Sequence, residues 1–326
     1  MTTRRTMIKG AVVAPLAGSA LLGALTTATA QDLTVNVGSK DFTEQFILGA
    51  MYRLVLEDMG IPTEDRANLG GTQIAQEALV SGEIHLYPEY TGTGLTEVLG
   101  LSVDDALGGG AMATPGATMA TPVTTDASQA VFDLVSARYA EEFGLVWLQR
   151  SPANNTQALA VKREFSDEQG ITTISQLAAV AGDYIISAPA DFPEREDGLL
   201  GLQRVYGEGF GEIEVLPVAP GLKYQALLDD QAQVVLAFGT DGQIAGYDLV
   251  VLEDDLGLWP PYNVAPVVRQ EVLDAYPDVA ARFDEVTLDL TDEVLSELNW
   301  RVDGDDKEEP VDVAASYLSD QGFVGS

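Results

Sequence analysis

A turn rich in tyrosine, threonine and glycine, Tyr87 to Gly94, carries the residue types in this chain that are best suited to ligand binding. It follows a short apolar strand, Ile84 to Leu86, and leads into an apolar segment, Leu95 to Leu99. At such a strand–helix turn, backbone N–H groups and hydroxyls converge on whatever lies above the strand end. Tyrosine rings present electron-rich faces that attract organic cations. The sequence therefore indicates a pocket for a small cation, although an ordinary strand–helix corner would use the same residues.

A second loop of this kind contains Lys40. Alternating apolar residues from Leu33 to Val37 predict a half-buried strand, and the apolar positions from Phe46 to Val55 mark one face of a helix that ends near Gly60. Asp41 and Glu44 have the spacing of a capping box at the helix start. Lys40 then lies on the loop at the carboxyl end of the strand, where it could hold an anionic group or remain a solvated surface lysine.

Composition excludes several classes of function. The chain has 326 residues, with 51 acidic and 17 basic side chains and a net charge of −34, which disfavours nucleic acid and anionic membranes as partners. The absence of cysteine excludes disulfides, thiol catalysis and zinc sites with cysteine ligands. A single histidine, His85, gives little support for metal or acid–base chemistry. We therefore expect no catalytic residue, no metal and no cofactor.

The first thirty residues have the pattern of an export signal. Arg4, Arg5 and Lys9 precede the small-residue apolar run 11–25, and Ala28-Thr29-Ala30 fits a cleavage site. The paired arginines resemble a twin-arginine signal. The sequence predicts an exported protein in the periplasm or at the outer face of the cytoplasmic membrane, without a cysteine for a lipid anchor.

The order of predicted elements indicates an α/β protein. Strands and helices alternate with short connections marked by glycine or proline, which favours a mostly parallel sheet covered on both faces. We expect one lobe from residues 31–152 and 240–326 and a second from residues 153–239. Residues 103–126 are of low complexity and predict a flexible, exposed insertion.

Six motifs in order resemble the glycine betaine/choline substrate-binding proteins of ABC osmoprotectant importers. The resemblance runs from about Leu33 to the C-terminus, apart from residues 103–126. The motifs are Gly38-Ser39-Lys40-Asp41-Phe42-Thr43-Glu44-Gln45, Leu69-Gly70-Gly71-Thr72, Gly82 to Thr93, Asn154-Asn155-Thr156, Glu194-Arg195-Glu196-Asp197-Gly198 and Thr240-Asp241-Gly242.

The resemblance implies a type II periplasmic-binding-protein fold, with two α/β lobes, a hinge of two crossover strands and a cleft between the lobes. Carried over by motif, Tyr90 and Tyr262 form walls of an aromatic box around a quaternary ammonium group. Thr93, Lys40 and Arg195 match the residues that hold the carboxylate of the solute. Trimethylammonium has no N–H to donate, so aromatic faces suit it, whereas a carboxylate needs charge-assisted donors.

Two positions depart from the family pattern. Gln157 and Phe238 stand where the family usually has tyrosine. Phe238 keeps an aromatic face without the hydroxyl, and Gln157 replaces a ring with an amide. The altered box could favour a solute that forms hydrogen bonds. Alternatively, Tyr262 and Trp259 could be packed aromatics at a hinge, and Arg195 could form an ion pair with a neighbouring carboxylate.

The function implied is a monomeric binding protein that captures a zwitterionic quaternary-ammonium solute and delivers it to the subunits of an ABC permease. Glycine betaine or a related betaine is the expected solute, with ectoine, carnitine or choline as alternatives. A solute-sensing receptor of the same fold is a second possibility. An enzyme is disfavoured, because the transferases of this shape depend on cysteine, and a hydrolase built on Glu89 or Asp241 has little support.

Overall fold

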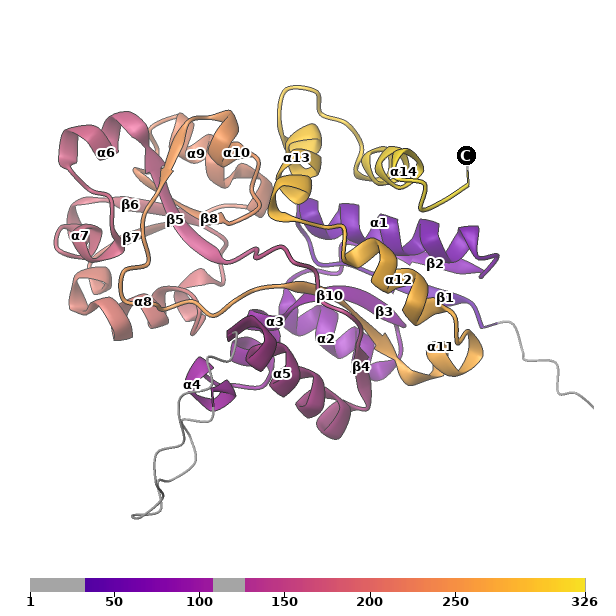
Figure 1. The fold of residues 1–326 in the computed structure, drawn as a ribbon. Helices are drawn as coiled ribbons and strands as arrows, with labels where there is room; N and C mark the ends of the chain where they lie inside the picture. The colour runs from indigo at the N-terminus through magenta and orange to yellow at the C-terminus, as the bar shows by residue number, and fades with distance from the viewer. Residues whose placement is uncertain (1–32, 108–126, 326) are drawn as a thin grey trace, which may run out of the picture. The chain divides into compact units, whose positions relative to one another are not determined.

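The computed structural model describes residues 33–107 and 127–325 (Figure 1). The predicted export signal lies outside these residues, as does most of the predicted insertion. The first residues of that insertion differ from the expectation, because Val103–Ala106 form a short helix, α4. The Ser102 backbone N–H donates to Asp105 Oδ2 at 2.8 Å, and the Ser102 hydroxyl donates to the same oxygen at 2.7 Å, which stabilises the start of this turn.

The first sheet has five strands in the order β2-β1-β3-β10-β4. The β1 strand pairs with β2 and β3 in parallel, whereas β10 runs antiparallel to β3 and β4. The strands are β1 (Val35–Gly38), β2 (Thr63–Arg66), β3 (Leu86–Tyr90), β4 (Leu145–Trp147) and β10 (Val264–Arg269).

The second sheet has five strands in the order β7-β6-β8-β5-β9. The β6 strand pairs with β7 and β8 in parallel, and β5 runs antiparallel to β8 and β9. The strands are β5 (Gln157–Lys162), β6 (Ile185–Ala188), β7 (Glu214–Pro217), β8 (Val234–Phe238) and β9 (Leu249–Val251).

Successive strand residues enter different hydrophobic cores on the two faces of each sheet. In β10, Val264 and Val268 pack into one core with the helix Thr43–Asp58 and the C-terminal helices. Ala265 and Val267 pack into another with the helices Thr72–Ser81 and Ala127–Phe143. The second sheet follows the same period of two. Leu159 and Val161 of β5 share a core with the helices Ile174–Ala178 and Leu199–Tyr206, whereas Ala158 and Ala160 share another with the helix Lys223–Leu228. Helices thus cover both faces of each sheet, as Figure 1 shows for the first.

The helices that share hydrophobic cores with the first sheet come from two stretches of the chain, residues 43–143 and 270–320. Among the described residues they are α1 (Thr43–Asp58), α2 (Thr72–Ser81), α5 (Ala127–Phe143), α11 (Gln270–Ala275), α12 (Val279–Thr287), α13 (Asp292–Asp303) and α14 (Pro310–Asp320). The helices near the second sheet are α6 (Arg163–Gln169), α7 (Ile174–Ala178), α8 (Leu199–Tyr206), α9 (Lys223–Leu228) and α10 (Gln243–Gly246).

The α/β class is confirmed, but the expectation of a mostly parallel sheet is wrong. Each sheet is mixed, because the strand that returns after a crossover, β10 or β5, runs against its neighbours. The division into lobes, with residues 153–239 as the second lobe, stays a prediction. Strand β9 lies beyond residue 239 and pairs with β5, so the second sheet includes residues that were expected in the first lobe. In the part of the chain that the structure describes, no helix combines the length and apolar character needed to cross a membrane.

Candidate ligand-binding site

Strand direction brings the predicted residues of the first sheet to one edge. Because β1 and β3 are parallel, Lys40 after β1 and Tyr90 at the end of β3 lie at the same edge. The antiparallel β10 begins there, with Val264 opposite Tyr90, so that Tyr262 just before β10 lies beside them. The Asn154 side chain accepts a hydrogen bond from the Tyr262 N–H at 2.7 Å and fixes this approach.

Strand direction also brings the predicted residues of the second sheet to one edge. Arg195 lies on the loop after β6, and Phe238 ends β8, which is parallel to β6. Gln157 begins the antiparallel β5 and pairs directly with Phe238. All seven predicted residues, Lys40, Tyr90, Thr93, Gln157, Arg195, Phe238 and Tyr262, line one cavity of about 1000 Å³. The structure thus brings the predicted set together, and their role in binding stays a prediction.

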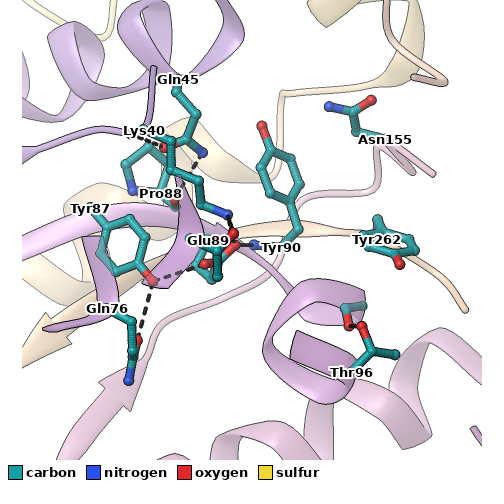
Figure 2. Close-up of polar contacts among 12 residues, drawn as sticks. Lys40, Gln45, Gln76, Tyr87, Pro88, Glu89, Tyr90, Thr96, Asn155 and Tyr262 are labelled. Atoms are coloured by element: carbon teal, nitrogen blue, oxygen red, sulfur yellow. Dashed lines mark hydrogen bonds and ion pairs between the residues drawn. The ribbon is translucent and has the colours of Figure 1, made fainter. Parts of the chain in front are cut away.

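Lys40 is buried, which excludes a solvated surface lysine, and its charge is already paired. Its Nζ lies 2.5 Å from Glu89 Oε1 and donates to the Thr72 hydroxyl at 3.2 Å. Figure 2 shows the Tyr87 hydroxyl and the Tyr90 N–H also pointing at the Glu89 carboxylate, at 2.8 and 2.6 Å. Burial lowers the pKa of Lys40, and the charge of Glu89 opposes that change. The ammonium lies 5.3 Å from the centre of the Tyr90 ring.

Arg195 forms the ion pair that the sequence left open. Its Nε and one terminal nitrogen donate to the two oxygens of Asp197 at 2.7 and 2.8 Å, and Asp191 lies 3.4 Å away. The Tyr262 hydroxyl donates to the same Asp197 carboxylate at 3.1 Å. Burial alone would raise the pKa of Asp197, but the hydrogen bonds and charge of Arg195 outweigh burial and hold it below its usual value. Asp197 therefore orients two of the predicted binding residues.

A ring that the sequence analysis did not assign connects Tyr90 to Phe238. Phe42, just before α1, stacks on each of them with ring centres 6.2 Å apart, at interplanar angles of 25° and 15°. Lys223 was also missed, and its Nζ lies 4.0 Å from the centre of the Phe238 ring and 2.8 Å from Asp241 Oδ2. The cavity thus has three near-parallel rings, two of which already attract an ammonium group of the protein.

The predicted capping box is wrong. Helix α1 begins after Phe42 without a side-chain cap, and Glu44 turns inward instead. Its carboxylate accepts from the Tyr90 hydroxyl and from Asn155 Nδ2 and Asn299 Nδ2, each at 2.8 Å, and from the Thr240 hydroxyl. Burial raises the pKa of Glu44, and these donors oppose that change. Glu44 therefore joins four distant segments around the cavity.

Glu97 is a half-buried carboxylate of the cavity lining. It lies in a π-helical turn, Gly94–Val98, one turn after Thr93. Burial, and then the charge of Asp197, raises the pKa of Glu97 to about 7, although Arg195 opposes this. The Asp197 N–H donates to Glu97 Oε1 at 3.3 Å.

We expect a Glu97→Gln variant to be more stable than the parent at pH 8 by about 1 kcal/mol, allowing for partial exposure of the group. Because the folded pKa lies above 4.5, the native state binds more protons between pH 4.5 and 7. Its stability therefore falls as pH rises through that window, and glutamine removes the loss. Thermal unfolding at pH 5 and pH 8 measures the difference, with exposed Glu77→Gln as the control. A Glu97→Gln variant that is no more stable than the parent at pH 8 would contradict the assignment.

The described residues contain no cluster of histidine, aspartate and glutamate arranged to hold a metal. What the cavity offers is stacked rings, three cations that each have a carboxylate partner, and buried amides and hydroxyls. Two sheets with a polar–aromatic cavity at their facing strand ends define a class of protein: an α/β receptor for a small solute.

Comparison with known proteins gives the family. Residues 33–320 match the substrate-binding domain of ABC-type glycine betaine transport systems, and the chain belongs to this family of transport proteins, which are not enzymes. It is 33% identical to the glycine betaine-binding protein YehZ of Escherichia coli K12, over 89% of this chain and 91% of that one. The fold matches a solved structure described as a glycine betaine/carnitine/choline ABC transporter, with a TM-score of 0.66 and 28% identity over 89% of this chain and 99% of the other. The type II periplasmic-binding-protein fold is thereby confirmed.

A third relative is a larger protein. The ergothioneine transport permease/ergothioneine binding protein EgtU of Helicobacter pylori is 31% identical over 88% of this chain, and this chain spans 47% of its length.

Proposed function

We propose that the protein captures a zwitterionic quaternary-ammonium solute, glycine betaine or a related betaine, and delivers it to the subunits of an ABC permease. The observation that carries the proposal is the pairing of an aromatic stack with cations in one cavity: Phe42, Tyr90 and Phe238 beside Lys40, Arg195 and Lys223. Trimethylammonium can be held only by ring faces and dispersion, with about 0.5–2 kcal/mol from each ring when water is excluded.

The pairing of the three cavity cations argues against an anionic solute and is compatible with a zwitterion. The three cavity cations have their own partners in Glu89, Asp197 and Asp241, so a solute of net charge zero adds no uncompensated charge. Its carboxylate can approach the remaining donor groups of Arg195 and Lys40 while its ammonium meets the rings. Tyr90, Tyr262 and Phe238 are the proposed walls, and Thr93 and Gln157 complete the site.

The proposed setting is outside the cytoplasm, with the protein acting as a monomer. The predicted export signal supports the location, and the net charge of −34 argues against nucleic acid as a partner. The relative from Helicobacter pylori is named as both a transport permease and a binding protein. This supports a permease as the partner of the present chain.

Titration calorimetry of the exported form tests the solute class. Against glycine betaine, proline betaine, carnitine, ectoine and choline, we expect a carboxylate-bearing compound to bind at least tenfold more tightly than choline. The physical reason is that Arg195 and Lys40 supply charge-assisted donors that choline leaves unused. Tightest binding to choline would contradict the roles of these two residues.

A further inference from the structure

Glu97 is half-buried, and it has fewer hydrogen-bond donors than Glu44 and Asp241, two other carboxylates of the cavity lining. Glu44 accepts from four donors, and Asp241 accepts from Lys223, from the Tyr224 hydroxyl and from the Phe238 N–H. In the described parts of the chain, Glu97 accepts one hydrogen bond, a long one of 3.3 Å from the Asp197 N–H. A carboxylate has about four acceptor positions, so those of Glu97 that do not face Asp197 are open to water or to a ligand.

The neighbours of Glu97 do not fill these positions. The Asp197 carboxyl is a neighbour with the same negative charge as Glu97, and it donates only when protonated. The charge of Arg195 also acts on Glu97, but its guanidinium is directed to both oxygens of Asp197 and to Asp191. Gln73 donates to the backbone carbonyl of Glu97 and not to its carboxylate. The side chain itself lines the cavity, with Thr93 one turn before it. A half-buried carboxylate that lines a ligand cavity can exchange a hydrogen bond from water for one from a ligand.

The smallest betaine cannot use this acceptor. Glycine betaine carries a quaternary nitrogen and a carboxylate, neither of which donates a hydrogen bond at neutral pH. A cavity of about 1000 Å³ lies at the upper end of the range for drug-sized ligands and has room for a longer solute. We propose that Glu97 is a specificity-determining residue that accepts a hydrogen bond from a hydroxyl or N–H group on the carbon skeleton of a betaine-type solute.

This inference rests on the proposed function, and it adds a requirement on the solute. Sites built to bond a donor reject the analogue that lacks it, because their polar groups are then left unpaired. Carnitine and γ-butyrobetaine form a matched pair that differs by one hydroxyl. By titration calorimetry at pH 8, the parent protein is expected to bind carnitine at least tenfold more tightly than γ-butyrobetaine.

Two variants separate the hydrogen bond from the charge. Glu97→Leu removes the acceptor, and is expected to weaken carnitine binding tenfold or more while changing γ-butyrobetaine binding less than threefold. Glu97→Gln keeps an acceptor oxygen without charge and is expected to retain part of the preference for carnitine. Glu77→Gln, an exposed position on α2 outside the cavity lining, is the control and keeps the parental ratio.

Equal affinity of the parent for the two solutes would overturn the inference. An equal loss of both affinities in Glu97→Leu would overturn it as well, because Glu97 would then act only through its charge. These outcomes leave the proposed function intact, since both betaines still bind. Absence of binding to glycine betaine and to both test solutes would instead overturn the proposed function, and this inference with it.

Discussion

An Asp197→Ala variant is expected to lose about 3–5 kcal/mol of unfolding free energy and to bind betaine-type solutes at least tenfold more weakly. The change leaves the guanidinium of Arg195, which is largely buried, without the carboxylate that accepts two of its hydrogen bonds. It also removes the acceptor of the Tyr262 hydroxyl. Urea unfolding and titration calorimetry measure the two effects.

The neighbouring carboxylate provides the control for this prediction. Asp191 lies 3.4 Å from Arg195 with a side chain that is 57% exposed, so Asp191→Ala is expected to cost less than about 1 kcal/mol. Since the folded pKa of Asp197 is lowered, its contribution is present above the usual carboxylate pKa and is lost as pH falls through the folded value. The difference between the parent and Asp197→Ala should therefore shrink in acid. Equal losses at Asp191 and Asp197 would refute the proposed role of Asp197.

A Gly92→Ala variant is expected to weaken solute binding at least tenfold through a single added methyl group. A Cβ at this position would lie 2.7 Å from three atoms of the Tyr262 ring. The ring is 2% exposed, and its hydroxyl bonds to Asp197, so it cannot turn aside without losing that contact. Such overpacking also costs about 1–3 kcal/mol of stability. Calorimetry and urea unfolding provide the measurements.

A double-mutant cycle gives this prediction its control. In a Tyr262→Ala background the clash is gone, so Gly92→Ala should then have little further effect on either quantity. Gly211→Ala, at a position with open space and an ordinary backbone conformation, should be neutral. Parental affinity in Gly92→Ala would show that the exact position of the Tyr262 ring does not matter for binding.

The sequence located one strand of the first sheet, misplaced a second and missed a third. The apolar alternation from Leu33 to Val37 corresponds to β1. The strand expected from Ile84 to Leu86 corresponds to β3, but β3 runs from Leu86 to Tyr90, so Tyr87 to Tyr90 form strand and not turn. The β2 strand, Thr63–Arg66, is polar and mostly exposed at the edge of its sheet, and only its pairing with β1 defines it. The sequence also could not predict strand direction. A buried strand has the same apolar residues whether the strand beside it runs parallel or antiparallel.

The candidate site shows a similar limit. Tyr90 lies at a strand end that local sequence can reveal, whereas Arg195 and Phe238 were assigned only through the resemblance to the family. Asp197 and Glu44 were missed as site residues because their role depends on partners far away in the sequence or on burial that no local pattern encodes. Phe42 and Lys223 were missed for a related reason: their neighbours Tyr90 and Phe238 meet them only in the folded chain.

The burial of the ion pairs formed by Lys40, Arg195 and Lys223 affects how they respond to the salt concentration around the protein. Charges on the outer surface interact through water and ions, and at 1 M salt their range shrinks to about 3 Å. The three cavity pairs are shielded from that atmosphere, because their lysine and arginine side chains are at most 21% exposed. The attraction within these three pairs is therefore expected to change less between dilute and concentrated brine than the attraction within exposed pairs.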